Sequence, residues 1–250
     1  MSVWLKVAVS AGLLALLAFL LPWDQVFEAL RRLPPERWAL VLAGFVAGHA
    51  LGVVKWRMFV ATGRALLRPA DAVRCYAAGL FANLCLPSIV GGDVLRMVMA
   101  GRITRRPEAA NWGGVLDRAT DALARGALLT SGGLAVLTSL PGWQGELLGG
   151  GLLAGLAAGV LAFAVAARTP LRRWPRRLRR PVGRSLVAFR RLRRRPGIAV
   201  TGLLISLTIQ GGFVLHNAWL GRALGIDVAL GVWFFAWPLA KLAGLLPISL

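Results

Sequence analysis

Long apolar runs, separated by connectors rich in arginine, constrain this chain more than any other feature. Runs of about 18 or more apolar residues cross about 30 Å of hydrocarbon as helices, and several occur within the 250 residues. The apolar fraction of 57% and the mean hydropathy of +0.67 are too high for an ordinary soluble domain. We therefore expect an all-α polytopic membrane protein with a single transmembrane domain over residues 1–250.

The apolar runs predict about six full spans. The first, at residues 3–21, lacks small residues at a cleavage position, so we interpret it as a retained span and not as a signal peptide. Residues 22–37 follow with an apolar stripe that is typical of an amphipathic helix lying along the interface. The other five spans are expected at about residues 38–54, 115–140, 147–167, 197–220 and 228–250.

The net charge of +20 comes from 30 basic and 10 acidic residues. In a soluble protein this excess would indicate nucleic-acid binding, but between apolar spans it follows the positive-inside rule, so we expect no nucleic-acid partner. The basic loop at about 168–196 contains no acidic residue, and we expect it to contact anionic membrane lipids between Arg168 and Arg195. The same rule predicts a cytoplasmic N-terminus, and the composition favours the bacterial inner (cytoplasmic) membrane.

Residues 75–101 form an apolar unit that is too short for two crossings. Basic residues flank both of its ends, and Pro87 and the pair Gly91-Gly92 interrupt it. Two spans do not fit in about 26 residues at 1.5 Å per residue. We therefore predict a re-entrant helical hairpin with Pro87 as its structural hinge.

Charged residues within this hairpin and at the start of the next span form the candidate site. A charge near the bilayer centre costs roughly 2.5–3.5 kcal/mol, so it persists mainly where a pathway needs it. In the simpler interpretation Asp93 caps a new helix and pairs with Arg96 at i+3. In the functional one the helix N-terminus and Arg96 accept an anion. The candidate substrate-binding residues are Gly91, Gly92, Asp93, Arg96, Asp117, Arg118, Asp121 and Arg57.

Two groups near the helix ends have a simpler interpretation as well. Asp117, Asp121 and Arg125 share one helical stripe, with Asp121 and Arg125 in the favourable pairing direction. A cytoplasmic helix end with arginines extending to the interface would explain them equally. Lys55 and Arg57 are interpreted first as a cytoplasmic helix end, with contact to a lipid phosphate as the alternative.

The remaining polar residues of the apolar segments favour structural roles. His49 is expected to be a packed core histidine, and Lys241 to pair with an acid elsewhere in the bundle. Cys75 and Cys85 have the spacing of neither a metal site nor a disulfide framework. We predict no metal and no cofactor, and the nucleotide-binding pattern G-x-x-x-x-G-K-[ST] is absent from the sequence.

Three segments carry a family resemblance. They read V-K-W-R at 54–57, F-A-N-L-C-L-P-S-I-V-G-G-D-V-L-R at 81–96 and G-V-L-D-R-A-T-D at 114–121. In order and approximate spacing the chain resembles the membrane domain of the lysylphosphatidylglycerol synthase family, also called flippase-like membrane proteins, from about residue 26 onward. Members of that family continue past L-P-x-S-L with a glycine-rich segment, so we expect a C-terminal truncation at Leu250.

The resemblance implies a domain that handles a lipid between leaflets. We predict a lipid translocase for a phospholipid or lipid-linked headgroup. The chain has no room for an aminoacyl-transferase domain, so that activity is not carried over. The alternatives left open are a membrane-embedded transferase and an accessory subunit whose partner is an envelope-synthesis enzyme.

Overall fold

The computed structural model describes residues 18–85, 91–137 and 195–243, with isolated positions at 12, 15, 16, 142, 143, 150 and 151. Every regular element among these residues is a helix, which confirms the all-α fold class. In chain order the helices are α2 (Trp23–Arg32), α3 (Pro35–Thr62), α4 (Pro69–Cys85), α5 (Gly91–Thr104), α6 (Pro107–Leu137), α9 (Pro196–Ala223) and α10 (Leu230–Ala243).

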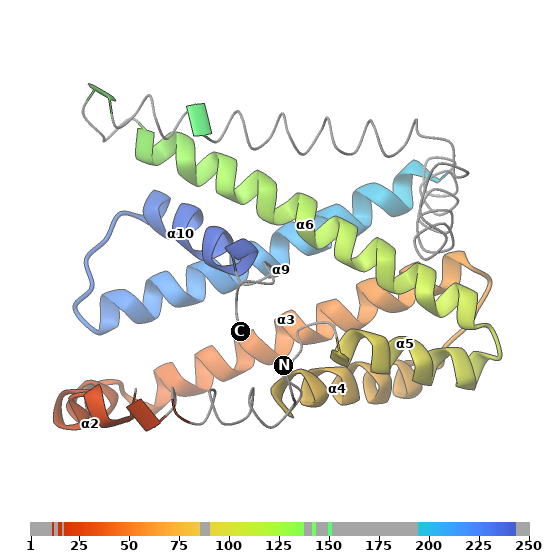
Figure 1. Cartoon of the computed structure of the whole chain (residues 1–250), viewed down its shortest axis with the longest axis horizontal. Coiled ribbons are helices and arrows are strands. Elements are labelled where there is room, and N and C mark those ends of the chain that lie inside the picture. The colour runs from red at the N-terminus through yellow and green to blue at the C-terminus, as the bar shows by residue number, and fades with distance from the viewer. Residues whose placement is uncertain are drawn as a thin grey trace.

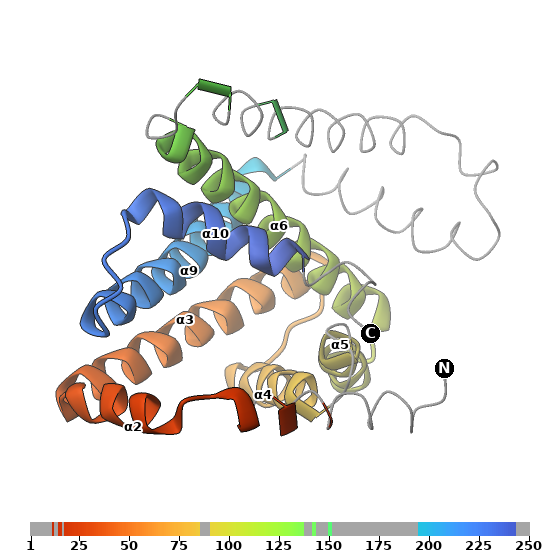
Figure 2. The same cartoon turned by 60° about the vertical axis from the view of Figure 1, so that its left-hand side comes forward.

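Three long helices, α3, α6 and α9, form the frame, and each of them packs against the other two. Figure 1 shows that α3 ends, and α6 and α9 begin, at the same end of the molecule. The shorter helices α4 and α5 pack together beside α3 and α6 near that end. Helix α10 lies against α6 and α9 in both views (Figures 1 and 2).

Proline sets the start of most of these helices. Its fixed φ suits the first helical turn, where its missing N–H costs no hydrogen bond. Two helix ends are marked instead by a left-handed residue, since Arg64 follows α3 with φ 62° and Arg105 follows α5 with φ 54°. The helices that begin with proline are α3, α4, α6 and α9.

Two described helices, α3 and α9, are each 28 residues long and are apolar enough to cross a membrane. They correspond to the spans predicted at 38–54 and 197–220, and α6 and α10 cover much of those predicted at 115–140 and 228–250. The spans at 3–21 and 147–167 and the basic loop at 168–196 lie largely outside the described residues. The count of six spans therefore stays a prediction.

Helices α4 and α5 pack as an antiparallel pair over the segment where the sequence predicts a re-entrant hairpin. Asn83 Oδ1 of α4 accepts a hydrogen bond of 3.0 Å from the Gly92 nitrogen at the start of α5. Gly79 keeps the helices close, because a Cβ there would lie 2.8 Å from the Gly92 oxygen. The hairpin starts at Pro69, earlier than the predicted residue 75. Pro87 lies outside the described residues, and re-entry from one side of the membrane stays a prediction.

The predicted helix end at Lys55 and Arg57 is wrong. Helix α3 continues to Thr62, and Lys55 and Trp56 are buried within it. The positive-inside rule treats a basic residue as a marker of the interface. Here carboxylates of α6 lie opposite Lys55, so the lysine is paired inside the bundle.

Small residues let the long helices cross closely. A Cβ at Gly113 of α6 would lie 2.8 Å from the Val60 nitrogen of α3. On α9, Gly202 faces the ring of Phe59 of α3. Such close approach is the usual means by which membrane helices gain packing contacts, since lipid offers no hydrophobic driving force between helices.

We expect Gly113→Ala to destabilise the fold, because the Val60 backbone that its methyl group would meet cannot move alone. Overpacking of this kind costs about 1–3 kcal/mol, or roughly 2–12 °C in the unfolding midpoint. Gly126→Ala on the same helix is the matched control, since its Cβ would meet nothing within 4 Å. Thermal unfolding in detergent checks this, and equal midpoints for the two variants would contradict the close crossing.

Candidate functional site

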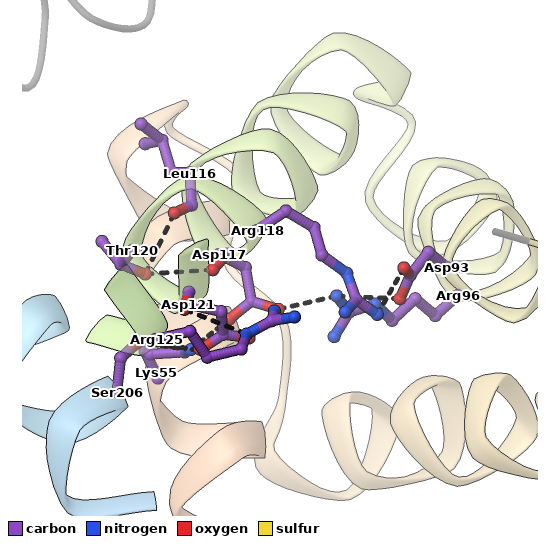
Figure 3. A network of polar contacts seen from close by, with 10 residues as sticks. All are labelled: Lys55, Asp93, Arg96, Leu116, Asp117, Arg118, Thr120, Asp121, Arg125 and Ser206. Atoms are coloured by element: carbon purple, nitrogen blue, oxygen red, sulfur yellow. Dashed lines mark hydrogen bonds and ion pairs between the residues drawn. The ribbon is translucent and has the colours of Figure 1, made fainter. Parts of the chain in front are cut away.

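A cluster of charged side chains lies where α3, α5, α6 and α9 approach one another (Figure 3). It brings together five residues that the sequence predicted as substrate-binding, which come from α5 and α6. It adds a lysine from α3, a serine from α9 and Arg125 of α6. The cluster consists of Lys55, Asp93, Arg96, Asp117, Arg118, Asp121, Arg125 and Ser206.

Arg96 is the centre of the α5 side of the cluster. Its Nη2 lies 2.6 Å from Asp117 Oδ2 and 3.1 Å from Asp93 Oδ1. The guanidinium carbon lies 5.3 Å from the ring centres of both Trp56 and Tyr76. Aromatic faces attract a cation by their quadrupole, so charge and ring contacts together hold this side chain, which is only 4% exposed.

Lys55 is the centre of the α3 side. Its Nζ donates to Ser206 Oγ at 2.8 Å and to Asp121 Oδ1, and it lies 3.0 Å from Asp117 Oδ1. Ser206 Oγ in turn donates to Asp121 Oδ1 at 2.9 Å. The ammonium therefore donates to two oxygens and forms an ion pair with a third, Asp117 Oδ1, which ties α3, α6 and α9 together at one point.

Arg118 is the open end of the cluster. Its Nη2 pairs with Asp93 Oδ2, and its side chain is 44% exposed, compared with 13% for Asp93. Charges of opposite sign therefore alternate from the surface to the interior, in the order Arg118, Asp93, Arg96, Asp117, Lys55 and Asp121. With Arg125, four cationic side chains stand against three carboxylates, an excess of one positive charge.

Helix α6 presents its charges from one stripe, as the spacing predicts. Arg125 Nε, however, donates to the main-chain oxygen of Asp121 at 3.1 Å, and the described residues show no ion pair between the two side chains. The Asp121 carboxylate is already engaged by Lys55 and Ser206. The Thr120 hydroxyl donates to the main-chain oxygens of Leu116 and Asp117 in its own helix. It therefore does not compete with the cations for the carboxylates.

The start of α5 confirms the ion pair of the simpler interpretation, whereas anion binding there stays a prediction. Asp93 lies in the first turn and pairs with Arg96, as its i+3 spacing predicts. The N–H of Gly92 is taken by Asn83, and Gly92 is buried against α4, whereas Gly91 is half-buried. The Gly92 backbone N–H is therefore already engaged within the hairpin.

Arg57 does not join the cluster. It is exposed, and its Nε donates to the Leu67 oxygen of the α3–α4 connection at 2.8 Å. Among the residues that the sequence missed, Lys55 carried a signal, since it is a charge inside an apolar run. Ser206 carried none, because a serine in an apolar helix is common and only its neighbours give it a role.

The other polar residues occupy structural positions. His49 packs among the rings of Phe45, Tyr76 and Phe213, as expected for a core histidine. Cys75 is a buried core residue with a free thiol. Lys241 is exposed and lies over the ring of Trp237, and the described residues show no acid paired with it.

The comparisons with known proteins identify the family. The model of the lysylphosphatidylglycerol synthase TM region matches residues 3–250, so the chain belongs to that family, as its motifs indicated. No curated protein and no solved structure matches the chain. Within the described residues no group of three or more His, Cys, Asp or Glu side chains is placed to hold a metal ion.

We expect Lys55→Met to destabilise the protein, because it leaves two carboxylates without their buried cation. Removing one partner of a buried pair costs about 3–5 kcal/mol, or roughly 6–20 °C in the unfolding midpoint. Adding Asp121→Asn should recover part of this loss, since one uncompensated charge is then removed.

Arg74→Met is the control for thermal unfolding in detergent. Its side chain is 78% exposed and lies 3.9 Å from Asp71, so the pair contributes little. A midpoint for Lys55→Met that matches Arg74→Met would show that the buried ion pairs do not hold α3 to α6.

Proposed function

We propose that this member of the lysylphosphatidylglycerol synthase TM family is a lipid translocase. Its substrate is a phospholipid or a lipid-linked headgroup, and the charged cluster is where that headgroup binds. The observation that carries the proposal is the alternating row of charges that runs from half-exposed Arg118 to buried Lys55. The family relates the chain to lipid metabolism in the membrane.

The depth of the cluster supports this role. At 1.5 Å per residue, Lys55 lies about 10 Å along α3 from its end at Thr62. Asp121 lies about 21 Å along α6 from Pro107, and Ser206 about 15 Å along α9 from Pro196. These helix ends lie on the same side of the molecule (Figure 1). A hydrocarbon core of about 30 Å that began at that side would have the cluster near mid-depth.

A polar cluster at that depth lowers the barrier to headgroup movement. A charged headgroup that enters hydrocarbon alone loses its hydration, which costs several kcal/mol per charge. Arg118 and Arg96 would provide charge-assisted hydrogen bonds to its phosphate in place of water. The acyl chains would stay in the bilayer beside α5 and α6, where large apolar side chains such as Val94, Leu95 and Val115 are exposed.

The distribution of arginines supports a cytoplasmic orientation for this end. The connections between α3 and α4, and between α5 and α6, are basic, as is the residue before α9. By the positive-inside rule this end faces the cytoplasm. With the predicted span at residues 3–21, the proposal is a multi-pass protein of the bacterial inner membrane with its N-terminus inside. The arginines at this end are Arg64, Arg68, Arg102, Arg105, Arg106 and Arg195.

The cluster is less suited to group transfer. A transferase needs a nucleophile beside a free base. Ser206 is fully buried and donates a hydrogen bond to Asp121, and Lys55 Nζ donates hydrogen bonds to both residues. Hydrogen bonds of this kind hold helices in place, which supports binding and movement over chemistry at this point.

We expect Arg118→Met to lower translocation at least about tenfold, since a hydrogen bond to a charged group is worth about 1.5–3 kcal/mol. The measurement uses liposomes that hold the purified protein and a fluorescent phosphatidylglycerol, with quenching from outside. Arg118 is half-exposed, so the variant should keep its fold, and thermal unfolding verifies this.

The matched control is Arg74→Met, an exposed arginine on α4 outside the cluster. It should keep the wild-type rate within about twofold, because a weak surface pair contributes little. Folded wild-type protein that moves no tested lipid would contradict translocation. Equal rates for Arg118→Met and wild type would remove the cluster from the path.

A further inference from the structure

Asp93 occupies an unexpected place for a carboxylate in a site that binds anions. One of its oxygens faces Arg96 Nη2 at 3.1 Å, and the other pairs with Arg118 Nη2. The carboxylate therefore bridges two guanidinium groups with one oxygen on each. It also lies in the first turn of α5, where the helix N-terminus favours a negative charge.

A phosphodiester has the same recognition chemistry as this carboxylate. It carries one negative charge and two non-bridging oxygens, and guanidinium groups bind both anions in the same way. Asp93 and a lipid phosphate therefore compete for the same two arginines. A lipid phosphate must be able to reach these arginines. Arg118 permits this, because it is the one cation of the row whose side chain is substantially exposed.

Arg96 has hydrogen-bonding capacity that the described residues do not use. Its Nε is buried and has no hydrogen-bond partner, although the side chain is only 4% exposed. Buried polar groups almost always have a partner. A phosphodiester between the two arginines has one non-bridging oxygen to accept from this Nε and a second one to pair with Arg118.

We propose that, in the substrate-free protein, Asp93 occupies the position between Arg96 and Arg118 where a phosphate binds. The phosphodiester of an anionic phospholipid displaces it from that position. The proposal rests on the proposed function and names the ligand of the same cluster. Arg96 stays in place during the exchange, because Asp117, Trp56 and Tyr76 hold it from the other side. Return of Asp93 to the arginines then releases the lipid.

The exchange makes a prediction that a merely structural Asp93 does not. Asp93→Asn removes the competing charge, so the protein should bind anionic lipid more tightly. The same change removes the group that displaces the lipid, so translocation should slow. Tighter binding together with slower movement separates this role from a loss of structure, which would weaken both.

The experiment titrates the purified full chain in detergent with short-chain phosphatidylglycerol by calorimetry. Asp93→Asn should lower the apparent Kd about tenfold, and Arg118→Met should raise it by a similar factor. Asp71→Asn is the matched control, because Asp71 also lies in the first helical turn of its hairpin helix but pairs only weakly with Arg74. It should leave the Kd unchanged.

A second arm titrates inorganic phosphate into the same proteins. Tighter binding of phosphatidylglycerol but not of inorganic phosphate by Asp93→Asn supports a lipid as the source of the phosphate. Equal tightening for both means that the site takes the phosphate group alone, and it overturns the assignment to lipid. Unchanged or weaker binding of phosphatidylglycerol by Asp93→Asn overturns the exchange.

Three further outcomes keep the test decisive. If Asp93→Asn weakens the binding of an aminoacyl phospholipid and leaves the binding of phosphatidylglycerol unchanged, Asp93 contacts a cationic headgroup, and the proposal is wrong. If Asp93→Asn does not fold, Arg118→Met decides, since wild-type affinity for phosphatidylglycerol in that variant would rule out the shared arginine. Binding without any translocation would overturn the proposed function and leave the exchange standing.

Discussion

The charge of Lys55 is the constraint on which the arrangement of the long helices depends. A buried ammonium is stable only with its donors satisfied and its charge balanced. Ser206 lies 2.8 Å from its Nζ and Asp117 3.0 Å away, and Asp121 also accepts from it, so the lysine joins α3 to α6 and α9. Close crossings without this charge could slide or rotate, since small residues permit contact without specifying it. The ion pairs fix the register that the glycines allow.

The position of the α4–α5 hairpin depends on the same row of charges. Asp117 lies between Lys55 and Arg96, with one oxygen toward each. Arg96 is thereby held against the rings of Trp56 and Tyr76, which belong to α3 and α4. A change at one link therefore leaves its neighbours with unpaired charge, so these residues should act as a unit and not additively. The fold and the candidate site share the same side chains.

Local spacing predicted part of this cluster, and tertiary contacts decided the rest. The pair Asp93 and Arg96 and the stripe on α6 follow from helical periodicity, which the sequence displays directly. Lys55 was assigned to a helix end because basic residues usually mark the interface, and only the facing carboxylates override that rule. Ser206 acquires its role from Asp121 and Lys55, which are 85 and 151 positions away in the sequence. No local pattern predicts such a relation.

Burial along the row of charges separates a fixed end from an exchangeable one. Lys55 is 2% exposed and held by three oxygens, and replacing Asp117 or Asp121 would remove charge that balances the buried ammonium. Arg118, at the other end, keeps contact with its surroundings and pairs with Asp93 alone among the described side chains. In the proposed exchange, an incoming anion takes the place of that carboxylate, so Arg118 is paired both before and after it. In the proposed function, substrate would therefore enter at Arg118 while Lys55 continues to hold the helices.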